Sequence, residues 1–265
     1  MPDYFPIPLD IDPKRRFGGL ERLYGEGTLT RLAAARVAVV GIGGVGCWVA
    51  EALARSGVGM LKLVDPDNLV ESNINRQIHA LDGTLGQAKV IAMATRISSI
   101  HPQCRVETVE DFLTPENVAT LLYGLDLVVD AIDNVRAKTA IAVHCHQARL
   151  PLLMAGGAGG KTDPRRIRVA DLAHTTQDPL LSKVRARLRR EHGFTRQPGK
   201  KFGIETVSSD EPLLRPPACA TGLQGLSCAG YGSSMAMTAS VAMFIVARAL
   251  EQLLRLATWQ NGTDA

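Results

Sequence analysis

The sequence lacks the features that define several protein classes. Its 265 residues include only five cysteines, no Cys-x-x-Cys pair and no internal repeat, and aromatic residues make up just 5%. Five widely spaced cysteines do not indicate a disulfide scaffold, and without Cys-x-x-Cys pairs a four-cysteine zinc site is not expected. The first residues also lack the apolar segment of a signal peptide. We therefore expect a cytoplasmic protein with reduced thiols.

No apolar run is long enough to cross a bilayer. The longest covers residues 235–247, whereas a spanning helix needs about 20 residues. Arg248 and Glu251 then return at helical spacing. We expect a buried C-terminal helix over about 234–257 and no stable membrane span, although a hydropathy scan can flag this helix as transmembrane.

The charge is small in total but unevenly placed. The chain has a net charge of +4, yet residues 180–201 carry +7, which leaves −3 for the rest. The cations of this basic segment are Lys183, Arg185, Arg187, Arg189, Arg190, Arg196, Lys200 and Lys201. Such a cluster is typical of a surface that follows the phosphates of a nucleic acid, and the alternative is a solvated helix face. Phe194 and Phe202 flank the segment and either contact bases or belong to the core.

Residues 36–156 alternate strand-like and helix-like segments. We expect strands at 37–40, 60–64, 104–109, 125–130 and 151–154, and helices at 44–56, 87–100 and 135–149, with one more beginning at Thr114-Pro115 with Thr114 as N-cap. A strand at 165–169, a basic helix at 179–193 and a strand near 202–207 within a long loop follow. This order predicts an α/β fold, a Rossmann-like, doubly wound, mostly parallel sheet with helices on both faces.

A glycine-rich turn follows the first expected strand. Gly41, Gly43, Gly44 and Gly46 form a Gly-x-Gly-Gly-x-Gly motif that opens a helix, which lets the backbone approach a phosphate. Asp65 lies at the end of the next strand, where a ribose-binding acid is expected. This pattern alone fits NAD, FAD and ATP equally well.

The segment after Asp65 favours a triphosphate. Asn73, Arg76 and Lys89 suit phosphate oxygens rather than the apolar slot that nicotinamide needs. Asp130 and Asp133 follow the fourth strand, where carboxylates could hold Mg²⁺. The residues expected at the ATP site are Gly41, Gly43, Gly44, Gly46, Asp65, Asp67, Asn73, Arg76, Gln77, Lys89, Asp133 and Asn134. Gln77 could instead pack its loop, and Asn134 could cap the following helix.

Together these motifs resemble the E1-like adenylating superfamily over about residues 17–160. The resemblance implies that Asp65 and Asp67 bind the ribose side, that Asn73, Arg76 and Lys89 bind the phosphates, and that Asp133 holds magnesium. It implies a single adenylation domain over 1–265. The core covers about 17–175, the basic segment and a crossover loop 176–233, and the C-terminal helix 234–257.

One position departs from the superfamily pattern. Many relatives carry an arginine in a Phe/Tyr-x-Arg motif that reaches the triphosphate of the neighbouring subunit. Here Gly19 follows Phe17 at that place, so Arg22 or Arg16 would have to substitute. The resemblance therefore also implies a homodimer.

Motifs in the second half resemble the family of bacterial tRNA threonylcarbamoyladenosine dehydratases. They are Ala155 to Lys161, Asp163-Pro164, Arg166 to Leu172 and Thr176 to Leu180. The resemblance implies an ATP- and Mg²⁺-dependent enzyme that cyclises N6-threonylcarbamoyladenosine (t6A) at position 37 of tRNA through an acyl-adenylate. Arg76, Lys89 and Asp133 would be its catalytic groups, and a monovalent cation is left open as a further cofactor.

Two other functions remain open. An E1-like activator of a ubiquitin-like sulfur carrier would use Cys219 or Cys228 as an acceptor, and Cys228 is a weak candidate for a catalytic group. Some relatives of the dehydratase are linked to a cysteine desulfurase relay, which would be a further partner. Both thiols could equally be small, semi-buried side chains. The third function is a non-catalytic NAD-binding module.

Overall fold

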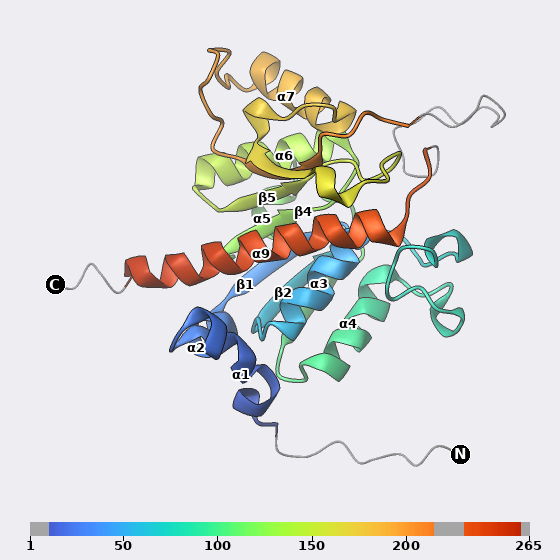
Figure 1. The fold of residues 1–265 in the computed structure, drawn as a ribbon, viewed down its shortest axis with the longest axis vertical. Helices are drawn as coiled ribbons and strands as arrows, with labels where there is room; N and C mark the ends of the chain where they lie inside the picture. Colours follow the sequence, from blue (N-terminus) through green and yellow to red (C-terminus); the bar gives the residue numbers. More distant parts are fainter. Residues whose placement is uncertain (1–10, 215–230, 261–265) are drawn as a thin grey trace.

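Seven strands form one sheet in the computed structural model, which describes residues 11–214 and 231–260 (Figure 1). The strand order is β3-β2-β1-β4-β5-β7-β6, and neighbours are parallel except for β6 and β7. The strands are β1 Arg36–Val40, β2 Met60–Val64, β3 Arg105–Val109, β4 Leu127–Asp130, β5 Leu152–Ala155, β6 Ile167–Asp171 and β7 Glu205–Ser209. The expected α/β, mostly parallel, Rossmann-like sheet is confirmed.

The central strands are apolar because both faces of the sheet are covered. In β1 the last four residues are buried, and all of β4 is buried. Val37 pairs with Leu61 on one side and with Leu127 on the other, so the three strands stay in register at the middle of the sheet. A run of buried β-branched residues is what a parallel sheet covered on both faces requires.

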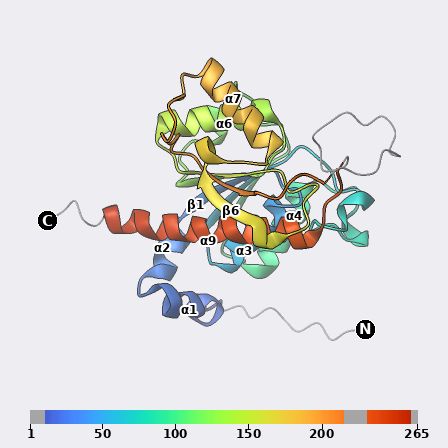
Figure 2. The same ribbon diagram turned by 45° about the horizontal axis from the view of Figure 1, so that its top comes forward.

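Helices cover the two faces in separate layers (Figure 2). On one face α3, α4 and α9 share a hydrophobic core with the strands, and on the other α5, α6 and α7 do. The helices are α1 Pro13–Tyr24, α2 Thr28–Ala34, α3 Gly46–Arg55, α4 Lys89–Ile100, α5 Val118–Leu121, α6 Val135–Ala148, α7 Pro179–Glu191 and α9 Met235–Gln260. Both faces of the sheet are therefore covered by helices.

The C-terminal helix α9 belongs to the core. By length and composition Met235–Leu254 could cross a membrane, and half of that stretch is buried. Met237, Val241, Ile245 and Ala249 are at most 2% exposed and join the same core as α3. Their spacing is that of one helical face, so the hydropathy of α9 is explained by packing against the sheet. The expected buried helix is confirmed.

The helix expected to begin at Thr114 begins later. Asn117 accepts a hydrogen bond from the backbone of Thr114 at 2.8 Å and donates one to the carbonyl of Phe112 at 2.9 Å. These bonds close residues 112–117 into a turn, so α5 starts only at Val118. The expectation of Thr114 as N-cap was wrong, because the asparagine side chain competes with helical bonding at this point.

Candidate nucleotide-binding site

A cavity of about 690 Å³ lies at the carboxyl ends of the central strands. Val40 and Val64, the last residues of β1 and β2, form part of its floor, and the loop after β4 forms another wall. In open α/β sheets ligands bind at this edge, at the point where the strand order changes direction. Here that point lies beside β1, because β2 and β3 are on one side of it and β4 and β5 on the other. The cavity size is that of a small-molecule site.

The glycine turn between β1 and α3 is required by close backbone packing. Gly41 has φ +89°, a conformation that favours glycine, and a Cβ on Gly46 would lie 1.8 Å from the carbonyl oxygen of Gly41. Gly41, Gly43 and Gly44 line the cavity. Gly46 is absent from that lining, so the structure gives it the role of closing the turn at the start of α3.

Asp65 connects this turn to the next strand. Its carboxylate accepts hydrogen bonds from the backbone N–H groups of Ile42, at 2.6 Å, and Asp67, at 2.9 Å. Lys89 at the start of α4 lies 2.7 Å from Asp67 and 3.7 Å from Asp65. Burial raises the pKa of Asp65, and the ammonium of Lys89 opposes that rise. The pair of acids therefore holds Lys89 at the cavity.

Arg76 and its neighbours form a second wall. The guanidinium of Arg76 donates to the carbonyl of Ser72 at 2.7 Å. The backbone carbonyl of Arg76 accepts a hydrogen bond from the indole of Trp48. Asn73 is buried and caps its own turn by accepting from Val70. The buried Oε1 of Gln77 has no hydrogen-bond partner within the described part of the chain. All three predicted residues of this loop, Asn73, Arg76 and Gln77, line the cavity.

The two acids after β4 have different surroundings. Asp130 and Lys138 are both 0% exposed and form an ion pair at 3.0 Å. The expectation that Asp130 joins Asp133 in holding Mg²⁺ was wrong, because Asp130 ends β4 facing the interior and is paired there. Burial raises the pKa of Asp130, and Lys138 opposes that rise. Asp133 lies in the exposed turn beyond it.

Asp133 is the carboxylate of the cavity that remains available. Within residues 11–214 and 231–260 it makes no recorded hydrogen bond or ion pair, and it lines the cavity. Mg²⁺ is usually bound by one or two carboxylates together with substrate phosphates, so a single free carboxylate beside a phosphate site fits the ion. The described residues contain no cluster of three acids, histidines or cysteines that could bind a metal alone. Asn134 lines the cavity and also caps α6 by accepting from Arg136 and Ala137.

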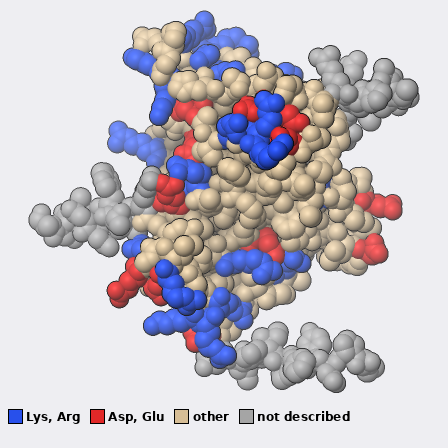
Figure 3. Space-filling model, in the orientation of Figure 1, with Lys and Arg blue, Asp and Glu red and all other residues tan. Residues whose placement is uncertain are grey.

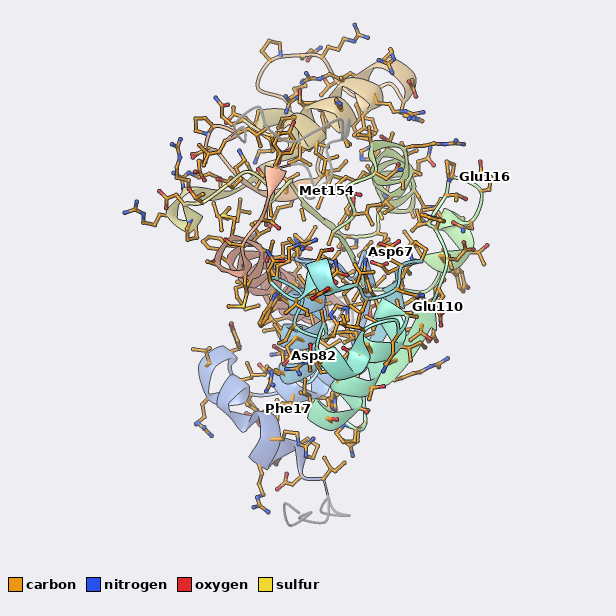
Figure 4. All side chains as sticks on the ribbon, turned by 90° about the vertical axis from the view of Figure 1, so that its right-hand side faces the viewer. Phe17, Asp67, Asp82, Glu110, Glu116 and Met154 are labelled. Carbon is orange, nitrogen blue, oxygen red and sulfur yellow. The ribbon has the colours of Figure 1, made fainter. Side chains whose placement is uncertain are left out.

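Several cavity residues were not expected from the sequence. Phe112 and Leu113 come from the segment between β3 and α5, and Lys161 and Asp178 come from the loops beyond β5. Figure 4 shows Glu110 and Glu116 at the outer edge of the first segment, with Asp67 nearer the middle of the molecule. Since β3 ends at the same edge as β1, the position of this segment could have been foreseen, but not which side chain faces the cavity.

The glycine loop after β5 is braced by buried charges. Asp178, which caps α7, accepts from the backbone of Gly157 at 2.9 Å. Lys161 is 3% exposed and donates to the carbonyls of Gln177 and Glu211. Burial lowers the pKa of Lys161, and Asp178 and Glu211 oppose that effect. These contacts hold the glycine loop in place beside the cavity.

The basic segment has two faces. Figure 3 shows Lys and Arg side chains gathered over α7 and the loop after it, and again over α1 at the opposite end. Lys183, Arg190, Arg196, Lys200 and Lys201 are exposed. Arg187 and Arg190 both pair with Glu191.

Arg185 is occupied within the fold, contrary to expectation, whereas the two phenylalanines that flank the segment follow one of the two interpretations left open for them. Arg185 donates to Thr175 and to the carbonyl of Leu172, so its guanidinium is not free for a phosphate. Phe202 is buried, and Phe194 packs against its ring at 5.0 Å between ring centroids. The core interpretation of the two phenylalanines therefore holds.

The two candidate arginines, Arg16 and Arg22, do not line the cavity of their own chain. Arg16 donates to the carbonyl of Ile100 at 2.6 Å, and Arg22 is exposed on α1. Cys219 and Cys228 fall outside the described residues. Cys145 on α6 is buried, and burial raises the pKa of its thiol to about 12.

Comparison with known proteins shows close, nearly full-length relatives. The ThiF family model matches residues 18–261. The tRNA threonylcarbamoyladenosine dehydratase of Haemophilus influenzae is 45% identical over 91% of this chain and 94% of its own length. A crystal structure of the Escherichia coli tRNA N6-threonylcarbamoyladenosine dehydratase in complex with ATP superimposes with a TM-score of 0.87, at 44% identity, over 96% of this chain and all of that one. The molybdopterin-synthase adenylyltransferase of Salmonella typhimurium is 38% identical, but over only 45% of this chain and 48% of its own.

Proposed function

The chain belongs to the ThiF family, and we propose that it is an ATP-dependent tRNA threonylcarbamoyladenosine dehydratase. The observation that carries this choice within the family is the match to a named dehydratase along 94% of that enzyme's length. The cavity supports it with a glycine turn, two cations and an unpaired carboxylate at one edge of the sheet. The E. coli dehydratase with the same fold was crystallised with ATP, which is consistent with ATP binding here.

The proposed reaction takes place in two steps. The threonyl carboxylate of t6A at position 37 attacks the α-phosphorus of ATP, and pyrophosphate leaves. An atom of the carbamoyl group then attacks the resulting acyl-adenylate carbon, which closes the ring and expels AMP. The net change on the tRNA is the loss of one water molecule. Because both attacking atoms belong to the substrate, no nucleophile from the protein is required.

The protein's task is to hold the phosphates and neutralise their charge. Lys89 and Arg76 are the two cations that line the cavity beside the glycine turn. When ATP binds, Lys89 exchanges part of its contact with Asp67 for phosphate oxygen, and Asp65 can accept from the ribose. Asp133 would hold Mg²⁺, which neutralises charge on the triphosphate. Such fixed charges are worth most in a site that excludes water.

Recognition of the tRNA is assigned to the exposed cations of the basic segment. Lys183, Arg190, Arg196, Lys200 and Lys201 have exposed side chains that can reach phosphates, and Arg190 is also paired with Glu191, whereas the guanidinium of Arg185 is bonded within the fold. We also propose a cytoplasmic homodimer in which Arg22 or Arg16 reaches the partner's triphosphate. Arg22 is the better candidate, because Arg16 is already bonded to Ile100.

Nucleoside mass spectrometry tests the activity directly. Purified protein with ATP and Mg²⁺ should convert t6A in tRNA to a product lighter by one water, and should release AMP and pyrophosphate. Unchanged t6A under these conditions would refute the proposal. The match to the molybdopterin-synthase adenylyltransferase keeps a carrier-protein activator as the second candidate. Pyrophosphate exchange that depends on a carrier protein and not on tRNA would favour it.

A further inference from the structure

An aromatic ring stands exposed at the mouth of the cavity. Phe112 lines the cavity, yet 66% of it is exposed. Its neighbour Leu113 also lines the cavity but is only 6% exposed. The two consecutive residues therefore face in different directions, with Leu113 inward and Phe112 outward. An exposed phenylalanine at the edge of a ligand site leaves apolar surface available to a ligand.

The backbone that carries this ring is held in place by side chains on both sides. Asp111 accepts from the N–H of Phe112 at 2.7 Å, and Asn117 donates to its carbonyl at 2.9 Å. Asn117 also accepts from Thr114, so both of its amide atoms are used to hold this turn. Buried Leu113 anchors the segment from below. The ring is thus presented on a fixed turn rather than on a loose loop, which limits the entropy lost when a partner binds it.

The inner part of the cavity already has the groups that an adenosine triphosphate requires. Val40, Val64 and Ile132 provide apolar surface, and Asp65, Arg76 and Lys89 line the same cavity beside the glycine turn. Phe112 lies at the exposed side together with Arg136, which also lines the cavity. Arg136 is 3.6 Å from Glu116, and both side chains are largely exposed, so that pair is weak and leaves the guanidinium available.

We propose that Phe112 is a stacking platform for an unpaired base of the tRNA anticodon loop, with Arg136 contacting an adjacent phosphate. This inference rests on the proposed function, because it takes the tRNA as the substrate. Proteins that recognise single-stranded RNA stack its bases on aromatic side chains and neutralise its phosphates with arginine. The platform would hold the modified nucleotide so that its carboxylate can enter the cavity.

Binding without turnover tests the platform. Affinities are measured separately for ATP and for a t6A-containing anticodon stem-loop, the latter with a non-hydrolysable ATP analogue, using wild type, Phe112→Ala and Phe112→Trp. The alanine variant should bind the stem-loop about 5- to 100-fold more weakly, as loss of one base–aromatic stack predicts, and bind ATP unchanged. The tryptophan variant should retain stem-loop affinity. Tyr123→Ala is the matched control, since Tyr123 is 82% exposed and lies outside this cavity.

Two results would overturn the platform. One is unchanged affinity of Phe112→Ala for the stem-loop, and the other is an equal loss of affinity for ATP, which would make Phe112 a wall of the nucleotide site. Failure of the proposed function is seen separately. Wild-type protein that binds the stem-loop but leaves t6A unchanged refutes the dehydration. The stem-loop affinities of the Phe112 variants can still be compared in that case, because they are measured without turnover.

Discussion

The charged residues around the cavity differ in their hydrogen-bond and ion-pair partners within the protein. Asp65 and Asp178 accept backbone N–H groups, and Lys161 donates to two carbonyls, so these side chains hold loops in place. Lys89 is paired with Asp67, a contact that phosphate can replace. Asp133 has no recorded partner in the described part of the chain. The free carboxylate is therefore the residue whose loss should affect chemistry and not folding.

Asp133→Asn should separate activity from stability. We expect kcat/KM for t6A-tRNA to fall by about 100-fold or more, because one fixed charge at the reacting phosphates is lost. The free energy of unfolding should change by less than about 0.5 kcal/mol, as for other exposed positions. Steady-state cyclisation and urea unfolding give the two numbers. Glu110→Gln, an exposed acid outside the cavity, is the control, and full activity of Asp133→Asn would contradict the role.

His79 should make stability depend on pH. Its ring is 2% exposed, and both ring nitrogens lack partners within the described residues. Burial lowers the pKa of His79 from 6.5 to about 4, and the positive charges of Lys89 and Arg96 add to this. In the unfolded chain His79 therefore binds a proton near pH 6.5, whereas in the folded chain it binds one only near pH 4. Stability should fall as pH drops through this window, by on the order of 3 kcal/mol at most.

Urea unfolding at pH 7.5 and pH 4.5 measures this dependence. His79→Leu removes the titrating group, so its stability should fall less between the two pH values than that of wild type. His174→Leu is the control, because His174 lies far along the chain and is not fully buried. An identical pH dependence in wild type and His79→Leu would show that other groups cause it.

At the scale of elements, the turn between β4 and α6 depends on a buried ion pair. Asp130 ends the strand and Lys138 lies one turn into the helix, and the pair joins them at 3.0 Å beneath the turn that carries Asp133. Burying two charges is costly unless they face each other. The pair therefore fixes how α6 meets the sheet, and removing one partner leaves the other charge buried alone.

Lys138→Met should destabilise the protein by about 3–5 kcal/mol, the usual cost of an uncompensated buried charge. Asp130→Asn should also be destabilising, and the double variant should lose much less than the sum of the two. Urea unfolding of all four proteins gives the coupling energy. Additive losses would mean that the two charges do not stabilise each other.

The basic helix α7 should divide into a binding face and a structural face. Lys183→Ala and Arg190→Ala should each lower the slope of log affinity for tRNA against log salt by about 0.7–0.9, if each side chain contacts one phosphate. Arg185→Ala should leave that slope unchanged and lower stability, because its guanidinium holds Thr175 and Leu172. Binding titrations from 50 to 200 mM salt, roughly the range in which such effects are large, test both statements. A changed slope for Arg185→Ala would contradict the division.

The elements that could be predicted from the sequence are those in which burial or close packing restricts which residue types fit. Residues 36–40 and 127–130 are apolar runs buried on both faces, and the glycine turn has a steric requirement that only glycine meets. The roles of Asp130 and Asp133 could not be separated, because spacing does not tell which side of the sheet a residue past a strand end faces. Phe112 was missed for a similar reason, since a lone phenylalanine gives no periodic signal.

At the scale of the whole molecule, a second group of exposed cations lies outside the basic segment. The residues outside the basic segment carry a net charge of −3. This net value conceals the cations of α1, which are all exposed: Lys14, Arg15, Arg16 and Arg22. Figure 3 shows Lys and Arg side chains over α1, at the end of the molecule opposite α7. Neither Arg16 nor Arg22 lines the cavity of its own chain. In a two-fold dimer such a surface can complete a site that it cannot reach within one chain.

Mixing two inactive variants tests whether α1 completes the partner's site. If Arg22 acts across the dimer, Arg22→Ala and Asp133→Ala should each be nearly inactive alone. In a mixed dimer one site carries both lesions, whereas the other combines an intact Asp133 with an intact Arg22 from its partner. Random exchange at equal amounts should therefore restore about a quarter of wild-type activity, because half of the dimers are mixed and each has one intact site. Arg16→Ala in place of Arg22→Ala is the matched comparison, and no recovery with either variant would mean that the triphosphate is neutralised within one chain.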